Sequence, residues 1–186
     1  MVINEKTLLK MMQKAYKGGG YHVMFDSRAG RRIMISNYGY AWGVVIERMH
    51  MPWSVLGLIV KHIGKIPEEE EAYLVNKDAV QEEVFDVAAK PMDNIMSQAK
   101  VSVAPALKRT QLVFDGRNVW QRSNDLSVIL VNPEYEDIAV LKETQPFMVA
   151  QCLYARGRHS QVFVGRIQPG EHEHEHIKLL GQLRWT

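Results

Sequence analysis

The first fifty residues show one helical pattern and then three strand-like patterns. Apolar residues recur at helical spacing over residues 7–16, and the three consecutive glycines 18–20 end that segment. Apolar and polar residues then alternate over residues 21–25 and 42–47, and a short apolar run lies between them at 33–36. Turn residues separate these segments. We therefore predict a helix followed by a three-stranded antiparallel meander.

The middle of the chain carries signals of helix starts. Apolar residues at helical spacing predict a short helix over residues 54–63. Pro67 and the four glutamates after it predict a second helix, because proline suits the first helical position and carboxylates meet the positive end of the helix dipole. A third helix is predicted over residues 79–89, ended by Pro91. We therefore expect the central part of the chain to be helical.

The C-terminal part shows the pattern of strands and tight turns. Residues 111–120 predict the clearest hairpin, since the Asp115-Gly116 pair suits a two-residue turn that requires positive φ. Residues 127–131 predict a buried strand, and residues 147–154 and 161–167 predict a second hairpin. Together with the N-terminal part, this pattern predicts an α+β protein with antiparallel sheet, an N-terminal helix and a central helical segment.

The chain is long enough for one domain or two small ones. Its 186 residues, 46% of them hydrophobic and 24% charged, are typical of a globular protein with a substantial core. The candidate boundary is a change of pattern near residues 100–106. Residues 1–100 would then hold the first helix, the meander and the central helices, and residues 101–186 mainly antiparallel hairpins. The alternative is one continuous domain.

We expect a cytoplasmic protein without membrane contact. The longest apolar stretch, residues 53–60, is far shorter than the ~18 residues that a membrane span requires. The first residues lack the apolar core of a signal peptide. The single cysteine, Cys152, excludes an internal disulfide framework and fits a reducing compartment. We interpret it as a small buried strand residue.

Positive charge gathers in the N-terminal part of the chain. Residues 1–50 carry eight lysines and arginines against three acids, which indicates an anionic partner. If the first helix packs beside the first hairpin, their cations would form one patch able to contact nucleic acid. The alternative is that these charges only keep the protein soluble, because the net charge of +2 is low for a nucleic-acid-binding domain. The candidate residues are Lys6, Lys10, Lys14, Arg28, Arg31 and Arg32.

Alternating glutamates and histidines occupy residues 171–176. As a strand, this run would place His172, His174 and His176 on one side, where three imidazoles could bind zinc or nickel. As a helix, it would pair His172 with His176 and match the H-E-x-x-H zinc-protease pattern, with Glu173 as the base. An alternating run produces that match trivially. The third interpretation is a solvated lead-in to a final amphipathic segment.

Three classes of function follow from these patterns. The chain contains no nucleotide-binding fingerprint and no G-x-S-x-G motif, so we expect a binding or accessory protein rather than an enzyme, with nucleic acid or protein as its partner and no cofactor. A helix-turn-helix role is rejected, because the second helix would present four glutamates to DNA. The alternative is a metal-dependent enzyme that uses residues 171–176. A third class is a homo-oligomeric assembly subunit, suggested by four tryptophans and ten methionines.

Overall fold

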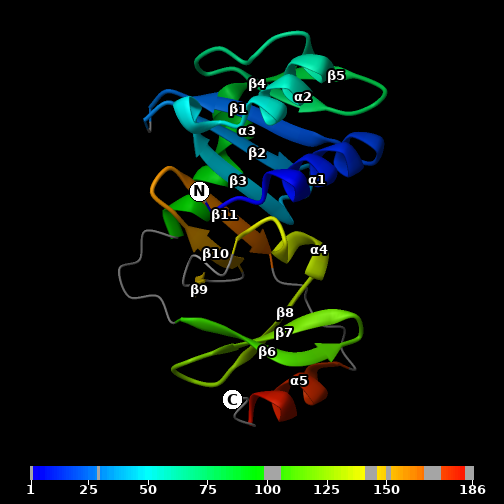
Figure 1. The fold of residues 1–186 in the computed structure, drawn as a ribbon, viewed down its shortest axis with the longest axis vertical. Helices are drawn as coiled ribbons and strands as arrows, with labels where there is room; N and C mark the ends of the chain where they lie inside the picture. The colour runs from blue at the N-terminus through cyan, green and yellow to red at the C-terminus, as the bar shows by residue number, and fades with distance from the viewer. Residues whose placement is uncertain are drawn as a thin grey trace.

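The computed structural model describes residues 2–28, 30–98, 106–140, 146–149, 152–165 and 173–182. Within these residues it combines helices with two antiparallel sheets, which confirms the predicted α+β class (Figure 1). The larger sheet has eight strands. In spatial order they are β5 (Val80–Glu83), β4 (Ala72–Val75), β1 (Tyr21–Asp26), β2 (Arg32–Asn37), β3 (Trp42–Glu47), β11 (Ser160–Gly165), β10 (Cys152–Arg156) and β9 (Phe147–Val149).

The predicted N-terminal helix and meander are both confirmed. Helix α1 (Glu5–Lys17) buries Leu8 against the large sheet, and β1, β2 and β3 follow it as adjacent antiparallel strands. Val23 lies opposite Ile35, and Ile35 lies opposite Val44. Local periodicity was sufficient to predict the meander, because each of its strands pairs with the next strand in the sequence.

Helices cover both faces of the large sheet, and the sheet's period of two assigns side chains to two cores. Helices α1 and α2 (Trp53–Ile63) cover one face, where Val23 and Ile46 are fully buried. Helix α3 (Phe85–Gln98) covers the other face, where Met24 and Phe163 are fully buried (Figure 1). The strands of the meander are therefore buried on both sides.

The helix predicted at Pro67 is wrong. The glutamates after Pro67 form a turn, in which the Glu71 carboxylate accepts a hydrogen bond from the backbone N–H of Glu68 at 2.7 Å. The chain then enters β4, which pairs with β1 and buries Ala72 and Val75 completely. Burial of these side chains beside β1 outweighed the local preference for a helix start.

The helix predicted over residues 79–89 is correct for residues 85–89 and wrong at both of its ends. Val80–Glu83 forms the edge strand β5, and α3 begins only at Phe85. Pro91 lies inside α3 instead of ending it. The apolar face of α3 continues at helical spacing on both sides of the proline. Ala88 before it and Met92 after it are both buried against the sheet. We attribute the tolerance of Pro91 to this burial, which offsets the lost backbone hydrogen bond.

The large sheet draws its strands from both sides of residues 100–106. Strand β11 pairs with β3, with Val162 opposite Val44 and Phe163 opposite Gly43. The Phe163 ring occupies the space that a side chain on Gly43 would fill, since a Cβ there would lie 2.3 Å from the ring. A glycine at this position therefore allows β3 and β11 to pair.

The smaller sheet contains β6 (Leu107–Phe114), β7 (Arg117–Arg122) and β8 (Val128–Val131). The predicted Asp115-Gly116 turn joins β6 to β7, and both residues have positive φ, 49° and 71°. Helix α4 (Pro133–Glu136) follows β8, and helix α5 (His174–Gly181) lies against this sheet (Figure 1). None of the helices in the described part of the chain is long and apolar enough to cross a bilayer.

Candidate functional site

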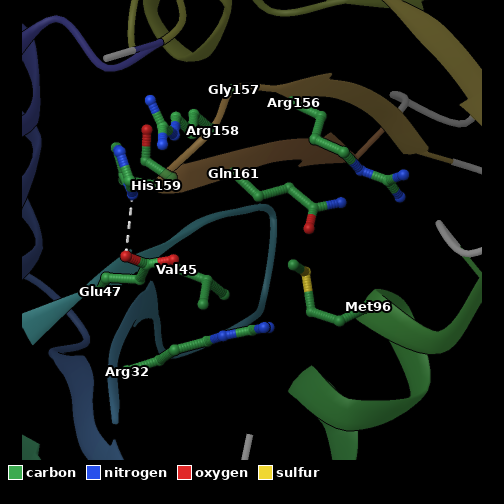
Figure 2. Close-up of a pocket in the computed structure, with 10 residues that line it drawn as sticks. Arg32, Val45, Glu47, Met96, Arg156, Gly157, Arg158, His159 and Gln161 are labelled. Carbon is green, nitrogen blue, oxygen red and sulfur yellow. Dashed lines mark hydrogen bonds and ion pairs between the residues drawn. The ribbon is translucent and has the colours of Figure 1, made fainter. Parts of the chain in front are cut away.

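A cavity of about 270 Å³ opens on the α3 side of the large sheet, where β2, β3 and the β10–β11 hairpin come together (Figure 2). We call it the arginine pocket. Its lining residues are Arg32, Val45, Glu47, Met96, Arg156, Gly157, Arg158, His159, Ser160 and Gln161.

Strand register builds one row of the pocket. Val45 of β3 lies opposite Gln161 of β11, and Gln161 lies opposite Arg156 of β10. Opposite residues in antiparallel strands place their side chains on the same face. The three side chains therefore form a row across the sheet, on the face that α3 covers.

A second row lies beside the first. Arg32 of β2 is opposite Glu47 of β3, and the backbone N–H of Glu47 donates to the carbonyl of His159 at 3.0 Å. Glu47 is two residues from Val45, so it shares the same face of the sheet. Figure 2 shows Arg32 entering from β2, while Arg158 comes from the β10–β11 turn. The β3–β11 pairing thus brings together cations from two distant parts of the chain.

The charge of the pocket is predominantly positive. Three arginines face one carboxylate, Glu47, whose Oε2 lies 2.9 Å from His159 Nδ1. The hydrogen bond with His159 keeps the pKa of Glu47 below its ordinary value, against a smaller opposing effect of burial. Within the part of the chain that the structure describes, neither Arg32 nor Arg158 has a carboxylate within salt-bridge distance. These two guanidinium groups are therefore available to an anionic ligand.

Gln161 adds a neutral donor to the same pocket. Its side-chain Nε2 is buried and has no hydrogen-bond partner among the described residues. Figure 2 shows its amide pointing into the space between Arg156 and Met96. Leaving a buried donor unpaired costs about 1–3 kcal/mol, which a ligand oxygen would recover. An acceptor bound here would thus meet both charged and neutral donors.

The lysines predicted to bind nucleic acid lie along α1. Lys6 and Lys10 are exposed, and Lys14 Nζ pairs with Glu134 Oε2 at 2.5 Å. Helix α1 covers the face of the sheet opposite the arginine pocket. The structure therefore separates these lysines from the pocket.

The three predicted arginines have different surroundings. Arg28 makes ion pairs with three carboxylates, those of Asp26, Asp86 and Asp93. Arg31 Nη2 pairs with Glu69 Oε1 at 2.6 Å. Arg32 alone among the six predicted basic residues lines the arginine pocket. The structure does not bring the six into one patch, and their role in nucleic-acid binding stays a prediction.

The glutamate–histidine run enters a helix within the described residues. Helix α5 begins at His174, and the His176 side chain is exposed on it. Nothing is described of the His174 side chain, and His172 lies outside the described residues. Glu173, the base of the predicted zinc-protease pattern, is ion-paired with Arg117 Nη1 at 3.1 Å. Residues 174–176 therefore do not form the strand face, and metal binding by the run stays a prediction.

Cys152 and the turn between β10 and β11 show what the sequence predicted and what it missed. Cys152 begins β10 as a half-buried residue, and burial raises the pKa of its thiol, so it is a poor nucleophile. The sequence had indicated a turn at Gly157-Arg158-His159, without a functional role for it. The concentration of cations at that turn was a usable signal, but its proximity to Arg32 depends on long-range strand pairing.

Comparisons with protein-family models, with curated proteins and with solved structures found no match for this chain. The functional argument therefore rests on the geometry and charge of the arginine pocket.

Proposed function

We propose that this protein binds a small phosphate-bearing molecule in the arginine pocket. The observation that supports this function is a cavity lined by Arg32 and Arg158, which make no salt bridge with any described residue, and by Gln161, whose amide donor has no partner among those residues. Guanidinium groups present a planar fork of donors that matches phosphate oxygens in a bidentate manner. The protein acts as a binding protein, and the arginines carry most of the affinity.

The size of the pocket favours a small ligand. A volume of about 270 Å³ lies just below the ~300–1,000 Å³ of pockets that enclose a drug-sized molecule. It admits a phosphate group and the adjoining part of the ligand, which would contact the apolar side chains of Val45 and Met96. A nucleic-acid backbone needs a continuous track of cations, and the predicted basic residues do not supply one. A small phosphate compound is therefore favoured over a polymer.

Calorimetric titration with inorganic pyrophosphate at low ionic strength tests this function. Wild-type protein should bind one pyrophosphate per chain. Arg158→Gln should weaken the affinity about 10-fold or more, since hydrogen bonds to charged groups are worth about 1.5–3 kcal/mol. The double variant Arg32→Gln/Arg158→Gln should lose measurable binding.

Lys77→Gln is the matched control, because Lys77 is exposed at the β4–β5 turn and its loss changes the net charge equally. It should bind pyrophosphate like the wild type. Equal weakening by Lys77→Gln would mean that general charge, not the pocket, attracts the anion. Absence of saturable binding by the wild type would overturn the proposed function. Binding of a single-stranded oligonucleotide but not of pyrophosphate would overturn the assignment to a small ligand.

A further inference from the structure

A second group of side chains meets at the edge of the arginine pocket. Glu47 ends β3, His50 lies in the short 3-10 helix η1 (Arg48–His50), and His159 lies in the β10–β11 turn. One ligand atom from each lies within 4.8 Å of the other two. Glu47 Oε2 is 2.9 Å from His159 Nδ1 and 3.7 Å from His50 Nδ1. Two imidazoles thus converge on one carboxylate oxygen.

We propose that Glu47, His50 and His159 bind a divalent transition metal ion of the zinc class. Two histidines and one carboxylate form an established set of ligands for zinc, with a remaining position for water or another ligand. Ligand atoms about 2.0–2.2 Å from a tetrahedral zinc ion stand roughly 3.3–3.6 Å from one another. The two measured distances of 2.9 and 3.7 Å lie on either side of that range. The third distance, between the ligand nitrogens of His50 and His159, is within 4.8 Å, and the three atoms would adjust to tetrahedral spacing on binding.

The two imidazole rings must open slightly to admit the metal. They are stacked, with ring centroids 3.7 Å apart and ring planes inclined by 16°. Each nitrogen lone pair lies in the plane of its ring, so lone pairs of nearly parallel rings cannot both point at one metal ion placed between the rings. His50 can tilt, because its side chain is 37% exposed. The stacked pair holds both Nδ1 atoms near Glu47, and rotation of His50 completes the ligand geometry.

The surrounding charges determine which species completes the coordination. Glu47 and His159 also line the arginine pocket, so the metal ion would lie beside Arg32 and Arg158. Because these arginines are positively charged, they favour water or an anion, and not a cationic group, at the remaining coordination position of the metal ion. The metal site does not rest on the proposed phosphate binding, because its three ligands converge without any contribution from the arginines.

Calorimetric titration of untagged, metal-free protein with zinc tests the site, with no phosphate present. One zinc ion should bind per chain. Replacement of either ligand, in His50→Ala or His159→Ala, should weaken the affinity at least about 100-fold, since loss of a second-shell partner alone costs about 10–100-fold. Cobalt should give the intense visible absorption of a tetrahedral complex in wild type and not in these variants. Both histidines are partly exposed, and a circular dichroism spectrum checks that each variant is folded.

Two control variants separate this site from its neighbours. The triple variant His172→Ala/His174→Ala/His176→Ala removes the histidines of residues 171–176 and should bind zinc like the wild type. Arg32→Gln/Arg158→Gln should lose pyrophosphate and keep zinc, so that failure of one proposal is distinguishable from failure of the other. Zinc binding that survives His50→Ala and His159→Ala and disappears in the triple variant would overturn the site. The absence of any zinc binding at micromolar concentrations would do the same.

Discussion

Replacing Gly43 by alanine tests the pairing between β3 and β11, on which the arginine pocket depends. The new Cβ would lie 2.3 Å from Phe163 Cε1 and 2.5 Å from Cζ, while carbon atoms in contact prefer about 3.5–4.0 Å. The ring would therefore have to move by more than about 1 Å, and it is fully buried. Overpacking of this kind costs about 1–3 kcal/mol, and we expect Gly43→Ala to lie near the upper limit. For a chain of this length the melting temperature should fall by roughly 6–12 °C.

Urea unfolding of a double-mutant cycle measures the clash directly. Phe163→Leu shortens the side chain that meets Gly43, so Gly43→Ala/Phe163→Leu should be less destabilised than the sum of the single variants, by about 1–3 kcal/mol. Gly57→Ala is the control, because Gly57 lies within α2 and a Cβ there meets nothing within 4 Å. That variant should gain about 0.5–1 kcal/mol of stability. Strict additivity in the cycle, or an unchanged Gly43→Ala, would refute the steric account.

Two further predictions concern a buried and a half-buried polar group, Glu136 and His62. Glu136 is 5% exposed, accepts hydrogen bonds from Asn118 and Trp120, and is ion-paired with Arg109. The variant Glu136→Gln should therefore lose about 1–3 kcal/mol of stability in urea unfolding. A change below about 0.5 kcal/mol would contradict this prediction. Burial and the nearby Lys61 lower the pKa of His62 from 6.5, so the unfolded chain takes up its proton first as the pH falls. The stability of the wild type should therefore decrease from pH 7 to pH 5. The resulting drop in melting temperature should be smaller in His62→Gln than in the wild type, and unchanged in the exposed control His176→Gln. An unchanged pH dependence in His62→Gln would assign the effect to other groups.

The parts of the fold that the sequence predicted correctly are those in which neighbours in sequence are neighbours in space. The meander and the Asp115-Gly116 hairpin have this property, and their periodicity and turn residues carried the whole signal. Strand β4 lacks it, because Ala72 and Val75 pair with β1, some fifty residues earlier in the chain. The local signal at Pro67 was that of a helix start, and pairing with β1 overrode it. The prediction at Pro91 failed for a related reason, since the apolar face of α3 stays buried on the sheet beyond the proline.

The candidate site was less accessible from the sequence than the fold. Arg32 was recognised as a candidate cation, but its expected companions were the lysines of α1 together with Arg28 and Arg31. The structure gives it Arg156 and Arg158 as companions in the pocket, and this depends on the register of β3 with β11. Glu47 and His50 lie only three residues apart, but His159 carried no spacing signal, because 112 residues separate it from Glu47. Clusters assembled by such pairings become visible only in three dimensions.

The pairing of β3 with β11 also has a consequence for the time course of protein synthesis. Glu47 leaves the ribosome 112 residues ahead of His159, and at about 5–20 residues per second this interval lasts roughly 6–22 seconds. During that interval β3 has β2 on one side and an unpaired edge on the other. Such an edge is a template for pairing with other chains. The strand Trp42–Glu47 is therefore exposed to aggregation until the β10–β11 hairpin pairs with it, and the arginine pocket cannot form before that hairpin has been synthesised.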